Sequence, residues 1–227
     1  MKSSKSTGPR KEIACSGEPC AAHGSEFKIV KGQCSEGVPA SVVRSLTAKA
    51  GERAHSKAST KCKGTGCSCV GRFYVTKLGK SPKSDDCVWW VVGAWRGVCA
   101  ADCGGVSEGP SDDLIGTIDA HGEMEDGPVP ERPEGRCDGR PCAASASAAI
   151  ELDAAPSDGI DSALFLALVD AAARVAKERA ARLCPKGCEC KGEFVVIDSG
   201  VEAMNLGRLR WVWWVGGEWR GKCLKLV

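Results

Sequence analysis

The sequence is poor in the residues that most enzymes use for catalysis. It has three histidines (His23, His55 and His121) and one tyrosine among 227 residues. It also lacks a phosphate-binding glycine loop, a dinucleotide-binding fingerprint, an HExxH helix and a GxSxG turn. Because nothing marks a nucleophile, a general base or an oxyanion donor, we predict that the protein is not an enzyme.

Long apolar runs are missing as well. None approaches the roughly 20 residues that a membrane-spanning helix requires. The N-terminal residues 1–14 carry four basic side chains but no apolar segment of the kind found in signal peptides. The net charge of +2 gives the chain no strong overall attraction to nucleic acid or to membranes. These features predict a protein that is cytoplasmic or exported without a leader, and that has no membrane partner.

Cysteine, in contrast, is abundant, with fifteen residues. Free buried thiols rarely occur in such numbers, so the composition indicates disulfides, metal sites or both. The odd total means that a monomer with only disulfides must leave at least one thiol unpaired.

One stretch of the chain occurs twice. VWWVVGAWRGVC at Val88–Cys99 returns as VWWVGGEWRGKC at Val212–Cys223, with nine of the twelve positions identical. CSGEPC at 15–20 likewise returns as CDGRPC at 137–142. The offset between matching cysteines stays between 121 and 124 residues. This regularity predicts the duplication of a whole cysteine-rich unit.

The repeat and the charge pattern divide the chain into four segments. The segment between the repeats is rich in glycine and proline and carries nine acidic residues against two basic ones, so we expect an extended, self-repelling linker. The predicted segments are a basic N-terminal arm (1–14), the first repeat (15–103), the acidic linker (104–136) and the second repeat (137–227).

Each repeat has a helical pattern followed by two strands. Apolar residues recur with helical spacing over about 38–59 and over about 157–183. The alternating pattern after each helix, followed by the tryptophan stretch, predicts an antiparallel hairpin. The expected fold class is therefore α+β, a tandem duplication in which each unit packs one long helix on a small antiparallel sheet.

The hairpin brings distant cysteines together. Each CxC pair lies at the start of the first strand with both side chains on one face, and the last cysteine follows the second strand at the same end. The helix ends there too, at another cysteine. We expect these four thiols to converge in each repeat: Cys62, Cys67, Cys69 and Cys99 in the first, and Cys184, Cys188, Cys190 and Cys223 in the second.

Two kinds of structure fit such a cluster. One is a tetrahedral structural Zn²⁺ site, one per repeat. The other is a set of disulfides, with Cys15, Cys20, Cys137 and Cys142 as additional bridges. Cys34, Cys87 and Cys103 have no counterpart in the second repeat, and we predict extra bridges for them in preference to a redox-sensing or intermolecular role.

The tryptophans have a structural and a functional interpretation. Adjacent tryptophans in a strand point to opposite faces, so one of each pair can pack under the helix while the other faces outward. Large aromatic residues are often simply part of the core, yet they also anchor interfaces. The candidate partner-binding residues are Trp90, Trp95, Arg96, Trp214, Trp219 and Arg220.

These observations favour a non-enzymatic tandem interaction or structural module, part of a larger assembly or an exported effector, with a protein partner or self-assembly. One alternative is a zinc-stabilised nucleic-acid-binding protein, because the first repeat has thirteen basic and seven acidic residues. Another is a carbohydrate-binding module that uses the tryptophan faces.

Overall fold

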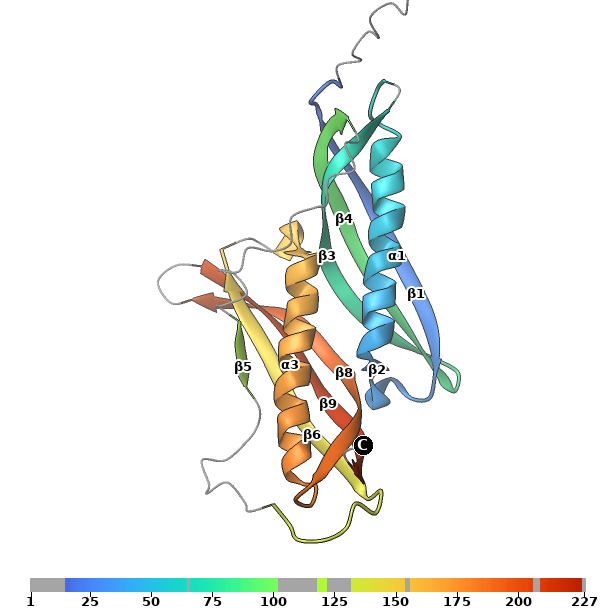
Figure 1. Ribbon diagram of the computed structural model, residues 1–227. Coiled ribbons are helices and arrows are strands. Elements are labelled where there is room, and N and C mark those ends of the chain that lie inside the picture. The colour runs from blue at the N-terminus through green and yellow to red at the C-terminus, as the bar shows by residue number, and fades with distance from the viewer. Residues whose placement is uncertain are drawn as a thin grey trace, which may run out of the picture.

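The computed structural model describes residues 15–64, 66–101, 118–121, 132–153, 156–205 and 209–225. They form a first half (15–101) and a second half (118–225), each with one long helix lying across an antiparallel sheet (Figure 1). The predicted α+β class is thus confirmed. Neither helix is long and apolar enough to cross a membrane, as far as the described residues extend.

The elements follow one another in the same order in both halves. Those of the first half are β1 (Pro19–Lys31), the 3-10 turn η1 (Cys34–Glu36), β2 (Val38–Pro39), α1 (Ala40–Ser59), β3 (Cys67–Lys83) and β4 (Asp86–Ala101). Those of the second half are β5 (Asp119–His121), β6 (Pro141–Leu152), the 3-10 turn η2 (Pro156–Asp158), β7 (Ile160–Asp161), α3 (Ser162–Arg182), β8 (Cys188–Asn205) and β9 (Leu209–Lys225). Only β5 has no earlier counterpart among them.

A long hairpin dominates each sheet. The strand orders are β1-β4-β3-β7 and β2-β8-β9-β6-β5. Hairpin β3–β4 has one irregularity, between Val75 and Lys77, and hairpin β8–β9 has one between Val196 and Asp198. Such bulges bend a strand and increase its twist. Each lies where its strand meets the other half.

The two halves exchange short edge strands. β7 comes from the second half but pairs with β3, with Ile160 opposite Val75. β2 comes from the first half but pairs with β8, with Val38 opposite Val196. Each half therefore completes the sheet of the other, and the backbone groups of both bulged strands find partners across the junction.

Two glycines make this exchange possible. Gly37 and Gly159 precede the exchanged strands with φ of +79° and +72°, a region that residues with a side chain rarely adopt. A Cβ at Gly37 would lie 2.6 Å from the carbonyl oxygen of Val196, and one at Gly159 would lie 2.8 Å from that of Val75. A side chain at either position would push the halves apart.

Polar contacts cross the same junction. Arg96 donates to the carbonyl of Ser157 at 3.3 Å and lies 3.7 Å from the carboxylate of Asp158. Arg220 donates to the carbonyl of Glu36 at 2.8 Å. Both arginines thus bind the 3-10 turn of the opposite half. Because the side chains are exposed, we expect these contacts to set orientation more than stability.

The core is continuous across the junction and is built on close helix–sheet contact. It contains Val43 and Trp89 of the first half together with Phe165 and Trp213 of the second. In the first half, Gly24 allows α1 to approach β1: a Cβ there would lie 2.3 Å from the carbonyl oxygen of Ala50. A glycine on the strand, facing the small residues Ala50 and Ala54 on the helix, therefore permits this spacing.

The helices begin later than the sequence pattern predicted. α1 starts at Ala40 and α3 at Ser162, because β2 and β7 occupy the preceding residues. The side chain of Asp161 accepts the backbone N–H groups of Ala163 and Leu164, which fixes the start of α3. β1 extends beyond the short strand that the sequence pattern predicts at Glu26–Val30, and β6 is a strand that the pattern did not predict. Within the predicted linker, Asp119–His121 pairs with β6.

We predict that Gly159→Ala destabilises the protein more than Gly139→Ala does. Gly139 has a similar φ of +76°, but a Cβ added there would meet no atom within 4 Å, so its substitution has only the backbone cost of about 1–2 kcal/mol. The clash at the junction should add roughly 1–3 kcal/mol for Gly159. Guanidinium unfolding of both variants measures the difference. Equal losses would contradict the strand exchange.

Candidate functional site

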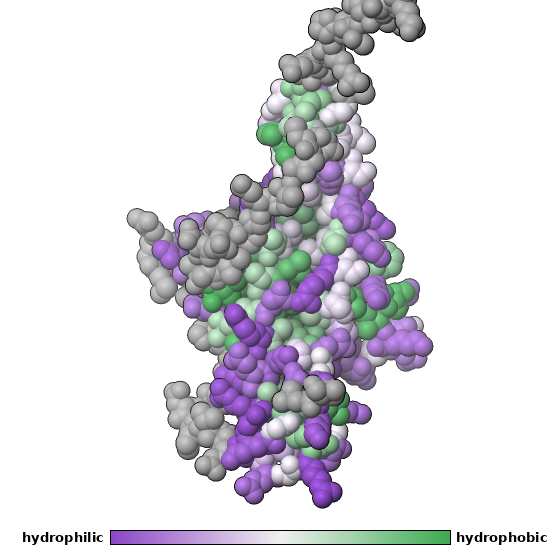
Figure 2. All heavy atoms as spheres, in the orientation of Figure 1, coloured by the Kyte–Doolittle hydropathy of each residue, from purple (hydrophilic) through white to green (hydrophobic). Residues whose placement is uncertain are grey.

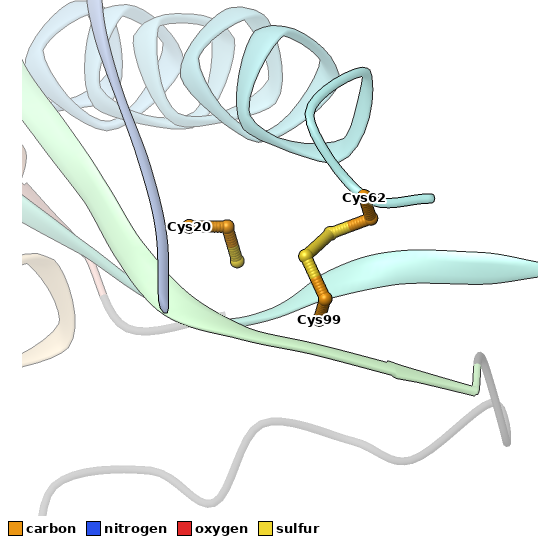
Figure 3. Close-up of side chains that lie close together, drawn as sticks. All are labelled: Cys20, Cys62 and Cys99. Carbon is orange, nitrogen blue, oxygen red and sulfur yellow. A yellow bond between two sulfur atoms is a disulfide. The ribbon is translucent and has the colours of Figure 1, made fainter. Parts of the chain in front are cut away.

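Three disulfides fasten the distal end of the first half, where α1 and β4 end. They are Cys15–Cys67, Cys20–Cys69 and Cys62–Cys99. Figure 3 shows the Cys62–Cys99 bond with the Cys20 side chain beside it. A fourth, Cys34–Cys87, joins η1 to the start of β4 at the opposite end of the sheet.

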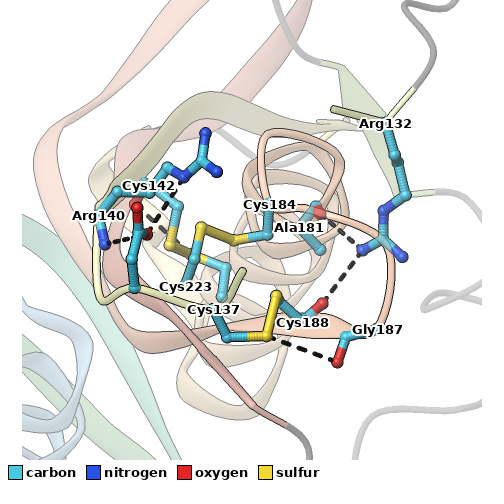
Figure 4. Close-up of a disulfide and its surroundings, with 11 residues drawn as sticks. Arg132, Cys137, Arg140, Cys142, Ala181, Cys184, Gly187, Cys188 and Cys223 are labelled. Carbon is cyan, nitrogen blue, oxygen red and sulfur yellow. Dashed lines mark hydrogen bonds and ion pairs between the residues drawn. A yellow bond between two sulfur atoms is a disulfide. The ribbon is translucent and has the colours of Figure 1, made fainter. Parts of the chain in front are cut away.

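The second half repeats the distal arrangement. Its disulfides are Cys137–Cys188, Cys142–Cys190 and Cys184–Cys223. Figure 4 shows them packed below the end of α3. Every matched cysteine takes the matched partner, so both halves have the same connectivity. Of the four cysteines expected to converge in the first repeat, Cys62 and Cys99 bond to each other, whereas Cys67 and Cys69 bond to Cys15 and Cys20.

The pairing follows from the position of each strand in its sheet. Cys69 and Cys99 lie directly opposite each other in the hairpin, but they are not bonded to one another. Cys69 bonds to Cys20 on β1, whereas Cys99 bonds to Cys62 at the end of the helix. The hairpin is thereby joined to the neighbouring strand and to the helix at once.

The disulfides leave no basis for the zinc alternative in this oxidised form. Two cysteine triads have sulfur atoms within 4.8 Å of one another, Cys20, Cys62 and Cys99, and Cys142, Cys184 and Cys190. Each of these sulfurs belongs to a disulfide, whereas zinc requires thiolates. The structure thus favours covalent bridges over one Zn²⁺ per repeat.

The bridges also bear on the remaining cysteine predictions. Cys34 and Cys87 form the extra bridge that we expected for them, and Cys103 lies outside the described residues. Seven disulfides indicate an oxidising, extracellular environment. This weighs against the cytoplasmic option of the sequence analysis.

Two arginines organise the distal end of the second half (Figure 4). Arg132 donates to the carbonyl of Ala181 at 2.7 Å, in the last turn of α3, where unpaired carbonyls need a donor. The backbone N–H of Arg140 donates to the Asp138 carboxylate at 3.1 Å. This bond, with the nearby guanidinium, lowers the pKa of Asp138 below its ordinary value.

The tryptophans alternate as the strand pattern predicts. Trp89 and Trp213 are buried under the helices. Trp90 and Trp214 are half-buried on the opposite face, where each ring lies over a glycine of the neighbouring strand, Gly79 or Gly200. The missing side chain of each glycine leaves room for the indole ring, and the ring in turn shields the glycine backbone from water.

The candidate partner-binding residues do not form one site. Trp95 is half-buried near the first disulfide cluster and donates its indole N–H to the carbonyl of Cys69 at 3.0 Å. Trp219 lies near the second cluster, with the Lys177 amine 5.5 Å from its ring centroid. Trp90 and Trp214 lie on the faces away from the helices, and Arg96 and Arg220 bind the opposite half.

An apolar surface appears on the first sheet, on the face that α1 does not cover. We call it the first open face, and by strand register it comprises Phe27, Ile29, Val70, Val88, Trp90, Val92 and Val98. Phe27 is 61% exposed and Ile29 is 44% exposed. Hydrophobic side chains reach the surface along the side where β1 lies (Figure 2).

Phe27 and Ile29 were not among the functional candidates predicted from the sequence. Their alternation with charged neighbours was the available signal, and it indicated only a short strand. Opposite Trp90 and Val88 in the register, they extend the apolar surface from the hairpin onto β1.

Comparison with known proteins offers no guide here, because no protein-family model, curated protein or solved structure matches this chain.

We predict that protein made in an oxidising compartment yields at most one free thiol per chain in denaturant without reductant. Fourteen of the fifteen cysteines are bonded in pairs, which leaves Cys103 alone. Ellman titration gives the thiol count, and metal analysis of the same sample should find far less than one zinc per chain. Several thiols together with stoichiometric zinc would instead restore the metal alternative.

Proposed function

We propose that the protein is a non-enzymatic tandem module, stabilised by disulfides, that binds a protein partner through the first open face. The supporting observation is an asymmetry between the two sheets. Four large hydrophobic side chains of the first open face are exposed: Phe27, Ile29, Val70 and Val98. Exposed apolar surface commonly marks an interaction site. Phe27 and Ile29 form one cluster beside Trp90 and Val88, and Val70 and Val98 form a second farther along the same face, beyond Arg72 and Arg96.

At the positions that match Phe27, Ile29, Val70 and Val98, the second sheet has small or charged residues, although Leu224 on the same face is 40% exposed. Ala149 and Glu151 stand opposite Trp214 and Val212, in the register positions that Phe27 and Ile29 occupy in the first half. Lys191 pairs with Lys222 where Val70 pairs with Val98. Since both sheets fold in the same way, the scaffold does not require the apolar residues of the first.

We further propose that the halves arose by duplication of one unit. The matching disulfides, bulges and glycines support this, as does the repeated tryptophan stretch. After duplication, one copy can keep the binding surface while the other completes the scaffold. The outcome is a module with one binding face held by two half-structures.

Rigidity favours such a role. The disulfides hold one end of each sheet and the exchanged strands hold the other, so the first open face is organised before a partner arrives. A preorganised surface loses less conformational entropy on binding. The carbohydrate alternative has less support, because every tryptophan whose side chain is described is buried or half-buried.

We predict that a photo-crosslinking amino acid at position 29 captures a protein partner, whereas the same residue at position 151 does not. Ile29 and Glu151 occupy matched register positions, opposite Val88 and Val212, on the two open faces. Crosslinking in the native secreted mixture, followed by mass spectrometry, identifies the partner. Sedimentation of the pure protein shows whether the partner is a second copy of this chain, in which case Phe27→Ser should reduce self-association.

The two positions control for one another. Equal crosslinking at 29 and 151, or none at either combined with monomeric behaviour that Phe27→Ser does not change, would refute the first open face as the binding surface. Retention on heparin at low salt that survives Phe27→Ser would favour nucleic-acid binding instead.

A further inference from the structure

A cavity of about 230 Å³ lies where the two halves meet. α3 lines it with Phe165 and Leu168, and β9 lines it with Trp213 and Trp214. Residues 75–78 of β3 and 199–201 of β8 form the remaining sides. The volume lies below the roughly 300–1,000 Å³ of drug-sized ligand sites, so a ligand here must be small.

The first half fills the equivalent place with its own side chain. Lys80 stands opposite Trp89 in the register, just as Val201 stands opposite Trp213. The Lys80 amine lies 5.4 Å from the Trp89 ring centroid and donates to the carbonyl of Ile197 at 2.6 Å. Val201 is shorter and has no amine, which leaves the space beside Trp213 open.

The polar lining of the cavity includes the hydroxyl groups of Thr76 and Ser199 and the amine of Lys77, and two indole rings form part of its wall. The indole N–H groups of Trp213 and Trp214 are buried and have no hydrogen-bond partner among the described residues, and Trp213 is only 5% exposed. A buried donor of this kind is costly unless something accepts its hydrogen bond. Trp89 also has an unpaired indole N–H, but the Lys80 amine already covers its ring.

The charge at the cavity is the reverse of that at its filled counterpart. Beside the bulge of β8, Asp198 lies 3.9 Å from Lys80. Beside the bulge of β3, the matching residue is Lys77, which lines the open cavity and has no ion pair within the described residues. Lys80 of the first half thus has an anionic partner, Asp198 of the second half, whereas Lys77 has none among the described residues.

We infer that this cavity binds a small amphipathic anion, such as a medium-chain or aromatic carboxylate. The apolar body of the ligand packs against Phe165 and Leu168. It occupies the space beside Trp213 that corresponds to the space filled by Lys80 beside Trp89. The carboxylate lies near the Lys77 amine, and the indole rings of Trp213 and Trp214 form part of the wall. The inference does not depend on the first open face.

The test is a titration of the ¹⁵N-labelled full chain with octanoate, octan-1-ol and octylamine, followed through the indole N–H signals. Trp213→Phe and Trp214→Phe assign the two signals. We expect octanoate to shift both signals at lower concentration than octan-1-ol, and octylamine to shift neither. No shift with any of the probes, or equal binding of octanoate and octylamine, would overturn the inference.

Two substitutions locate the site. Val201→Lys copies the arrangement around Trp89 and should abolish the octanoate shifts. The other signals of the variant should keep the dispersion of a folded protein. Lys77→Met should weaken octanoate about fivefold, the upper range for an exposed ion pair, and leave octan-1-ol unchanged. Lys49→Met, an exposed substitution on α1, is the matched control.

Because Lys77 is exposed, its variant tests the inference even if Val201→Lys fails to fold. Octanoate binding that Lys77→Met and Lys49→Met alter equally would refute the anion-binding role. Octanoate binding that survives a folded Val201→Lys would place the ligand elsewhere.

Discussion

The reciprocal pairing of short strands is the constraint on which the rest of the structure depends. β2 closes the edge of β8 and β7 closes the edge of β3, so neither bulged strand ends its sheet unpaired. An unpaired edge there would expose backbone donors and acceptors beside the core. Gly37 and Gly159 permit the approach, and the arginines Arg96 and Arg220 then reach the turns that precede the exchanged strands. The continuous core and the cavity beside Trp213 both follow from this junction.

Disulfides and exchanged strands stabilise different ends of each half. The three matched disulfides of each half lie at its distal end, at opposite ends of the molecule, and the exchanged strands lie at the centre (Figure 1). Helices rich in alanine contribute little side-chain area to a core, so each half gains from a covalent closure where its partner does not reach. Cys34–Cys87 adds a bridge next to β2, at the side of the first half that faces the junction. The cysteines therefore compensate for small helix residues, which are themselves needed for the close approach to the sheets.

The sequence carried enough information for the helices, the hairpins and the gathering of the cysteines, because each of these depends on local periodicity. It could not give the disulfide partners, since Cys69 faces Cys99 in the register but bonds across to β1. β6 was not predicted because alanine and serine have low strand propensity and no clear alternation. β2 and β7 have two residues each, too few for any pattern, and they are strands only because the other half supplies their partner. Phe27 and Ile29 became significant only once β1 was placed beside the tryptophan strand.

The differences between the halves carry more functional information than the similarities. Residues that match are the ones that the shared scaffold needs: the cysteines, the glycines under the tryptophans and the tryptophans themselves. Where residues at matching register positions differ, the residue found in one half shows that the fold does not require the residue found in the other. Val201 in place of Lys80 leaves a buried indole beside an open space, and Phe27 in place of Ala149 leaves an aromatic ring in solvent. An exposed aromatic ring is unfavourable in water, a cost that Ala149 avoids at the matching position, whereas an unpaired indole N–H is found at both Trp89 and Trp213 and does not distinguish the halves. The cost of an exposed ring is tolerated most readily at a position where a partner removes it.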